Sequence, residues 1–503
     1  MKKYHFIIIL CAVASVLGGL WPLLGDRKDL TIENVSVGGV PATIFRNLGG
    51  DNGPVALIAH GFAGSQQLMQ PMAMTLAHSG YTAITFDFAG HGRNERPMRG
   101  GVRDIGESTR TLLSEIDEMV GFARGLARGR PIALVGHSMA ADLITQYAMN
   151  RPEIGAVAAL SVFGAGITAS EPRNLLVVTG AWEPSMLTEA AARIAGLAAG
   201  GSAAERVTYG DFAAGTARRY VLARGAEHIG VLYSRDALSE TRDWLNSAFG
   251  QKGQGAIDSR GLWLALLFGG LLALAAPLAM RFPSLSAQPL GAGLGWGKLA
   301  PAAIAPAVLT PLILWKAPTD FLPILLGDYL ACHFVIYGLL SAGGLWLMGW
   351  RPSKGGALRW RRVLIPSLLL AAYYILGLGL ALDAFITSFM PSGERWIIMA
   401  PMLLATSLYF CWDEWMTRGA GAARGGYVFS KVCFLASLLF AVGLNPEKLF
   451  FLIIIVPVIF LFFIVYGLVS RWAYARTGDP RVAALGNAAS LAWAIAVTFP
   501  IVS

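Results

Sequence analysis

The chain has 503 residues, of which 55% are hydrophobic and only 14% are charged, and its formal net charge is +9. A charged fraction well below the usual quarter of a soluble protein indicates a large membrane-embedded part. We expect no nucleic-acid partner, because much of the basic excess lies in short loops between apolar runs, where it sets membrane orientation.

The N-terminal segment is strongly apolar. Lys2 and Lys3 precede an apolar run from Phe6 to about Leu24, so residues 1–25 are predicted to form a transmembrane anchor. A cleaved signal peptide is the alternative reading of the same pattern. In either case the chain that follows is expected on the extracytoplasmic side of the membrane.

Residues 26–255 are predicted to form an α/β domain, because short apolar runs alternate there with helical stretches. The predicted strands are Val55–His60, Thr82–Phe88, Pro131–Gly136, Ala156–Phe163, Leu175–Thr179 and Tyr220–Ala223. The predicted helices are Asp104–Ala127, a stretch that follows the Pro131–Gly136 run and reaches about Asn150, Ser185–Ala199 and Ser234–Phe249. Such alternation favours a mostly parallel sheet with helices on both faces. Sheets of this kind bind ligands at the carboxyl ends of their strands.

The strongest motif is Gly-His-Ser-Met-Ala at positions 136–140, which directly follows a predicted strand and opens a predicted helix. A strand–turn–helix context with small residues is what a nucleophile elbow requires, because the turn must lift the hydroxyl of Ser138 clear of the backbone. Ala140 stands where glycine is usual, which adds only a methyl group. An ordinary serine at a helix N-terminus is the competing interpretation of Ser138.

Four further segments occur in an order that matches a known superfamily. They are His60–Gly64 after an early strand, Asp87–Gly92 after the next one, Gly180–Pro184 after a later one, and Glu227-His228 after the last. With the elbow, they make the region from about Val35 to Gly250 resemble the α/β-hydrolase superfamily, in particular its esterase-like and lysophospholipase-like serine hydrolases. The predicted strands near Phe163 and Leu175 leave no room for the helical cap that many lipases insert.

The resemblance implies a serine hydrolase triad. Ser138 would be the nucleophile, His228 the general base, and Glu183 the acid that orients and stabilises the imidazolium. The backbone N–H groups of Phe62 and Met139 would form the oxyanion hole. This chemistry needs no cofactor, and the four cysteines all lie in apolar runs without metal-ligand spacing, so we expect neither a cofactor nor a metal ion.

Some of these assignments have rivals within the same domain. The superfamily more often uses aspartate as its acid, so Glu171 or Asp211 could replace Glu183 if the turn is misread. Three other histidines could compete with His228, and they are His60, His91 and His137. Asp87 is expected to brace its turn through backbone hydrogen bonds, and Asp142 is expected to be structural.

Residues 256–503 are predicted to be a membrane domain of about eight transmembrane helices, since each apolar run is near the length that crosses a bilayer. The predicted spans are Leu262–Met280, Leu299–Trp315, Leu325–Trp350, Val363–Leu382, Trp396–Trp412, Tyr427–Leu444, Leu449–Ser470 and Val482–Val502.

The basic residues of the loops predict the orientation of these spans. With the N-terminus inside, the inner loops and span ends carry Arg281, Lys298, Arg351, Lys354, Arg359, Arg361, Arg362, Arg418, Arg424, Lys431, Arg471, Arg476 and Arg481. The outer loops carry only Lys316, Arg395 and Lys448. This distribution follows the positive-inside rule and predicts an extracytoplasmic hydrolase domain in a bacterial inner or plasma membrane.

Ionisable residues in or near the spans invite functional hypotheses. Asp328, His333 and Asp383 are predicted on the outer side, where they could form a polar patch beneath the active site; simple interfacial placement is the alternative. Lys431, near an inner end, is expected to extend its ammonium group toward the inner surface.

Together these features predict a membrane-anchored serine hydrolase that cleaves carboxylic esters, with lipid or lipid-linked acyl esters as candidate substrates and the bilayer as its surroundings. Two alternatives stay open. The same triad serves acyltransferases and peptidases. A transporter-like membrane protein could also carry a hydrolase-like domain as a non-catalytic binding module.

Overall fold

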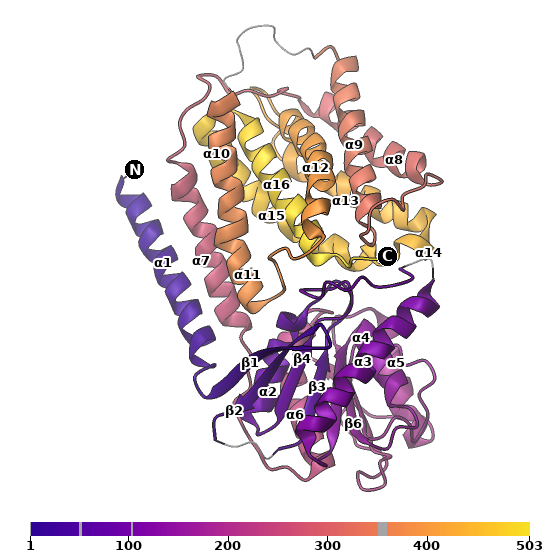
Figure 1. Cartoon of the computed structure of the whole chain (residues 1–503). Helices are drawn as coiled ribbons and strands as arrows, with labels where there is room; N and C mark the ends of the chain where they lie inside the picture. The colour runs from indigo at the N-terminus through magenta and orange to yellow at the C-terminus, as the bar shows by residue number, and fades with distance from the viewer. Residues whose placement is uncertain (1, 50–52, 102–103, 351–359) are drawn as a thin grey trace. The chain divides into compact units, whose positions relative to one another are not determined.

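The computed structural model describes every residue except 1, 50–52, 102–103 and 351–359 (Figure 1). It divides into two compact units. The larger unit comprises Leu17–Leu267, Leu382–Phe389 and Pro500–Ser503, so it contains the whole of the predicted 26–255 region. The smaller unit comprises Met1–Val16, Phe268–Ala381 and Met390–Phe499.

An eight-stranded sheet in the order β1-β2-β4-β3-β5-β6-β7-β8 forms the centre of the larger unit. Its strands are β1 Leu30–Val37, β2 Val40–Asn47, β3 Val55–Ala59, β4 Thr82–Phe86, β5 Ile132–His137, β6 Ile154–Leu160, β7 Leu175–Gly180 and β8 Arg218–Ala223. The strands from β3 to β8 run parallel, and β2 is antiparallel to both β1 and β4. The predicted mostly parallel sheet is therefore confirmed, and the carboxyl ends of six strands share one edge.

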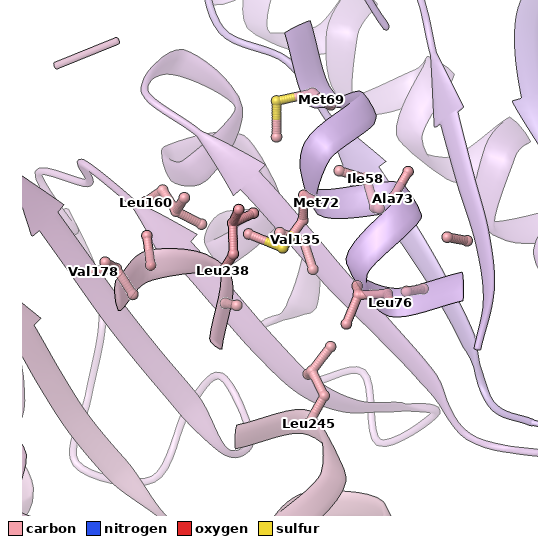
Figure 2. Close-up of a cluster of buried hydrophobic side chains, with 14 of the residues drawn as sticks. Ile58, Met69, Met72, Ala73, Leu76, Val135, Leu160, Val178, Leu238 and Leu245 are labelled. Atoms are coloured by element: carbon pink, nitrogen blue, oxygen red, sulfur yellow. The ribbon is translucent and has the colours of Figure 1, made fainter. Parts of the chain in front are cut away.

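Helices cover both faces of this sheet. They are α2 Gln70–His78, α3 Ile105–Ala127, α4 Met139–Ala148, α5 Ser185–Ala199 and α6 Arg235–Phe249. Helices α2 and α6 pack on one face, where Ile58 and Val135 meet Met72 and Leu238 in the cluster that Figure 2 shows. Because side chains alternate along a strand, the equally buried Leu57 and Leu134 point to the opposite face, where α3 and α4 contact β3 and β5.

The sequence interpretation missed the first two strands. Strands β1 and β2 form a hairpin whose turn at Gly38 and Gly39 has φ angles of 54° and 101°, which only glycine adopts easily. The structure also corrects the last predicted span, because its helix ends at Thr498 and does not continue to Val502. Val502 instead forms a parallel bridge with Met98 of the larger unit.

Within the described residues, nine helices are long and apolar enough to cross a membrane, although the structure contains no membrane. They are Phe6–Gly25 within α1 Lys2–Gly25, α7 Gly261–Ala279, α8 Trp296–Leu314, α9 Gly327–Leu347, the stretch Arg361–Phe385 that runs from the second residue of α10 Trp360–Ala372 to the end of α11 Gly379–Phe385, α12 Arg395–Thr417, α13 Gly426–Leu444, α15 Leu452–Thr477 and α16 Pro480–Thr498. This set is compatible with a multi-pass membrane protein. The side on which each loop lies stays a prediction, and residues 351–359, with three of the counted basic residues, fall outside the described part.

The ionisable side chains near the spans have partners of their own. Lys431 does not extend to a surface as expected, because its side chain is buried and its ammonium group binds Asp413 and lies near four aromatic rings. Asp328 accepts the N–H groups of Phe321 and Tyr329. His333 hydrogen-bonds to Ser437, and Asp383 binds Arg93 of the larger unit. Each of the three side chains therefore has a partner, and the polar patch stays a prediction.

Candidate active site

Ser138 occupies a sharp turn between β5 and α4. Its φ of 55° and ψ of −123° lie in a region that L-residues rarely adopt, at a cost of about 1–3 kcal/mol. The turn needs small neighbours, since a Cβ added at Gly136 would lie 2.7 Å from the carbonyl oxygen of Ala140. Ala140 itself is fully buried, so its methyl group fits where glycine is usual. The local geometry is that of the predicted nucleophile elbow.

The three predicted triad side chains come from three different strand ends and meet. Ser138 follows β5, Glu183 follows β7, and His228 follows β8. His228 Nε2 lies 3.0 Å from Ser138 Oγ, and His228 Nδ1 lies 2.6 Å from Glu183 Oε2. The hydroxyl, the imidazole and the carboxylate thus form one continuous hydrogen-bonded chain at the carboxyl edge of the sheet.

Glu183 has a buried carboxylate with donors on both oxygens. Its side chain is fully buried, and Oε1 accepts hydrogen bonds of 2.7 Å from the Ser161 hydroxyl and from the Gly180 N–H. Burial alone would raise the pKa of Glu183, but the hydrogen bonds from His228, Ser161 and Gly180 outweigh it and hold the pKa below its ordinary value. The acid is therefore ionised at neutral pH.

An ionised Glu183 fixes the tautomer of His228. A carboxylate can only accept hydrogen bonds, so Nδ1 of His228 must carry a proton and donate it. In the neutral imidazole, Nε2 then has a free lone pair that can accept the proton of the Ser138 hydroxyl. The arrangement can act as a general base on Ser138.

The loop after β3 lies beside the nucleophile. A Cβ added at Gly61 would lie 3.0 Å from the Cβ of Ser138, so the backbone that leads into Phe62 passes close to the hydroxyl-bearing carbon. The loop turns tightly, with a hydrogen bond from the Gly64 N–H to the Gly61 carbonyl and a φ of 53° at Ala63. Met139 is the first residue of α4, where N–H groups have no acceptor within the helix. The predicted oxyanion donors at Phe62 and Met139 thus belong to the two segments that flank Ser138.

The three rival histidines make other contacts. His60 Nε2 accepts from the Phe88 N–H, so its Nδ1 must donate to the Gly61 carbonyl, and the ring ties two loops together. His91 Nδ1 contacts the Ala89 carbonyl oxygen. His137 Nε2 donates to the carbonyl oxygen of His228, and burial lowers the pKa of His137 to about 3, with His228 contributing further. His137 is therefore neutral and supports the backbone of the base.

The rival acids also lie elsewhere. The backbone N–H groups of Glu171 and Asp211 donate to Oγ1 of Thr168 and of Thr216 within their own loops, and the Asp211 carboxylate accepts the Ala214 N–H. Asp142 accepts the N–H groups of Phe163 and Gly164, which is a structural contact, as expected.

Asp87 makes the bracing contacts that the sequence indicated. It accepts the backbone N–H groups of Gln66 and Arg93 and the side-chain amide of Gln66. These bonds connect its turn to the residues that follow the Gly61 loop.

The sequence interpretation overlooked Ser161, which follows β6 and hydrogen-bonds to Glu183. A usable signal was present: Ser161 is the first residue after an apolar strand adjacent to β7, and the strand ends of a parallel sheet share one edge. Among the residues that the structure describes, no group of three or more His, Cys, Asp and Glu side chains could hold a metal ion.

Three large apolar side chains that are close in sequence to Ser161 or Glu183 are exposed. Trp182, next to Glu183, is 72% exposed, Met186 at the start of α5 is 56% exposed, and Phe163, two residues after Ser161, is 47% exposed. Covering an exposed apolar side chain of this size is favourable. We call Phe163, Trp182 and Met186 the apolar rim.

Comparisons with known proteins find one matching family model and several similar solved structures. A model of the family described as serine aminopeptidase, S33, matches residues 51–203, which include Ser138 and Glu183 but not His228. Several solved hydrolase structures are similar. The epoxide hydrolase VrEH1 from Vigna radiata is 23% identical, with a TM-score of 0.21, over 27% of this chain and 41% of its own length. Est1E from Butyrivibrio proteoclasticus, solved with ferulic acid bound, is 15% identical, with a TM-score of 0.32, over 44% of this chain and all of its own.

Proposed function

We propose that this protein is a membrane-anchored serine hydrolase that cleaves carboxylic esters at the extracytoplasmic face through an acyl-enzyme. The observation that carries the proposal is the continuous hydrogen-bonded chain from Ser138 through His228 to Glu183. The match of residues 51–203 to a serine peptidase family supports it independently of that geometry.

The proposed reaction has two halves. His228 Nε2 takes the proton of Ser138 as Oγ forms a bond to the ester carbonyl carbon, and the carbonyl oxygen becomes an oxyanion that the N–H groups of Phe62 and Met139 stabilise. His228 then gives its proton to the leaving alcohol as the C–O bond breaks, which leaves the acyl group on Ser138. A water molecule repeats the sequence, with His228 as base and then acid, and releases the carboxylic acid and free Ser138.

The apolar rim favours a substrate with an apolar acyl part. An acyl chain that covers Trp182 and Met186 would gain about 25 cal/mol for each Å² of apolar surface removed from water. The region between β6 and β7, residues 161–174, contains no helix that could act as a cap, so the rim can be reached from solvent. In the part of the chain that the structure describes, nine helices are able to cross a bilayer, and this proximity makes membrane lipid esters candidate substrates.

A peptidase using the same residues is a second candidate, because the matched family is described as a serine aminopeptidase. An aminopeptidase must bind the ammonium group of its substrate, and Glu227 is an exposed acid beside His228. Its carboxylate, however, already accepts the N–H groups of Ile229 and Gly230. We therefore propose ester hydrolysis ahead of peptide hydrolysis.

The test uses the full chain purified in detergent. A fluorophosphonate probe should label the wild type and not Ser138→Ala, and a series of p-nitrophenyl esters from acetate to dodecanoate should be hydrolysed. Aminoacyl p-nitroanilides serve as the peptidase arm of the same experiment. Absence of labelling and of turnover would refute a serine hydrolase, and turnover of the anilides alone would replace esterase by peptidase.

A further inference from the structure

We infer that Ser161 is a positioning residue of this site: its hydroxyl fixes the carboxylate of Glu183 so that one oxygen alone faces His228. The inference rests on the proposed function, since it concerns the alignment of the same three side chains.

The carboxylate of Glu183 is held on both sides. Oε1 receives two donors, Ser161 Oγ and the Gly180 N–H, each at 2.7 Å, while Oε2 receives His228 Nδ1 at 2.6 Å. A glutamate has one more rotatable bond than the aspartate usual at this place, so its carboxylate can swing more freely. The donor from Ser161 removes that freedom and leaves Oε2 for the imidazole.

Ser161 is placed for this contact by an unusual backbone. It is 1% exposed and has a φ of 60°, in the left-handed region that residues with a Cβ rarely occupy. Its N–H still bonds to the Val178 carbonyl oxygen at 2.8 Å, so Ser161 extends the pairing of β6 with β7 while its hydroxyl reaches Glu183. Unfavourable backbone geometry of this kind gathers at functional sites.

The hydroxyl has no structural role that would explain it equally well. The loop after Ser161 is held by other bonds, since Asp142 accepts the Phe163 and Gly164 N–H groups and Arg193 donates to the Phe163 carbonyl. Glu183 is the partner that the structure gives to the Ser161 hydroxyl. Removing that hydroxyl should therefore disturb the carboxylate and leave the loop in place.

Two substitutions separate position from folding. Ser161→Ala removes the hydroxyl and keeps the unfavourable backbone, whereas Ser161→Gly removes the hydroxyl and accepts a φ of 60° without strain. We expect Ser161→Gly to melt at or above the wild-type temperature and Ser161→Ala at or below it. Both should lose about 10- to 100-fold in kcat with KM nearly unchanged, the size expected for one hydrogen bond to a charged group.

The pH profile is a readout that a purely structural role would not move. Without the donor from Ser161, less of the carboxylate charge is neutralised, so the protonated form of His228 is favoured. The acid limb of kcat/KM should then move to higher pH in both variants.

A double-mutant cycle completes the experiment, with p-nitrophenyl butyrate as substrate and the full chain in detergent. In a Glu183→Gln background, Ser161→Gly should change kcat less than threefold, because the two side chains act as one unit. The inference would be overturned if Ser161→Gly lowered kcat equally in both backgrounds, or if the single variants kept the wild-type kcat and pH profile. Labelling of the wild type by the fluorophosphonate probe would in that case still uphold the hydrolase. An unlabelled, inactive wild type would overturn both.

Discussion

Replacing Glu183 by glutamine tests the role of the acid with almost no change of shape. The amide oxygen can keep both donors that Oε1 now receives, from Ser161 and Gly180, which leaves the amide NH₂ facing His228 Nδ1 at the 2.6 Å contact. Two donors cannot share that contact. His228 must then accept at Nδ1 and carry its proton on Nε2, where it can no longer take the proton of Ser138.

The expected loss follows from this tautomer change. In serine proteases the corresponding acid-to-amide substitution lowers kcat about 10⁴-fold, which equals about 5.5 kcal/mol of activation free energy. We expect a loss of that order in Glu183→Gln, with a free energy of unfolding within about 1 kcal/mol of wild type because the Oε1 hydrogen bonds persist.

The assay is the initial rate of p-nitrophenyl butyrate hydrolysis by the full chain in detergent, with thermal melting followed in the same samples. Asp211→Asn is the matched control, since Asp211 is exposed and bonds only within its own loop; it should keep wild-type kcat. A Glu183→Gln variant that retained more than a tenth of wild-type kcat would show that Glu183 is not the acid.

Three further outcomes are expected. Gly61→Ala should lower kcat at least tenfold and destabilise the fold by about 1–3 kcal/mol, because the new methyl group would lie 3.0 Å from Ser138 Cβ. The control is Gly121→Ala on α3, where nothing lies within 4 Å of the new methyl group; it should stabilise the fold by about 0.5–1 kcal/mol and keep full activity. Burial raises the pKa of Glu115 to about 6 from an ordinary 4.5, so the folded state binds its proton more tightly than the unfolded state does. The free energy of unfolding should therefore fall by about 2 kcal/mol as the pH rises from 4.5 to 6. Melting curves of Glu115→Gln should not show this fall. Trp182→Ala should raise KM for p-nitrophenyl dodecanoate and leave KM for the acetate unchanged, whereas equal effects on both would remove the apolar rim from substrate binding.

Short-range patterns were the predictable part of this molecule. The buried run of β5 followed by Gly136 and Ser138 encodes a strand, a tight turn and a helix within about 20 residues. The predicted acid and base lie in the loops that follow β7 and β8, and a parallel sheet brings its carboxyl ends to one edge. The resemblance to the α/β-hydrolase superfamily, together with the expected parallel sheet, predicted that Ser138, Glu183 and His228 would meet, and in the structure they do.

Contacts between distant residues were less accessible. Ser161 stands at a strand end as the sequence indicates, but its hydrogen bond to Glu183 also depends on a left-handed backbone that the sequence does not predict. Lys431 was expected at a surface because an unpaired ammonium group is costly in an apolar setting. Its partner Asp413 lies 18 residues earlier on another helix, and only the packing of α12 against α13 brings the two together.

The larger unit is discontinuous, and this affects how the protein can be made. Ser388 donates its N–H to Ser65 Oγ, and Ile501 hydrogen-bonds with Gly90 and Met98, so residues made late in synthesis complete a sheet domain begun much earlier. At typical translation speeds of about 5–20 residues per second, residue 503 emerges roughly 10–50 s after residue 267. During that interval the nascent sheet domain lacks its last segments. A polypeptide shortened after residue 267 would lack the hydrogen bonds that these segments make with Ser65, Gly90 and Met98.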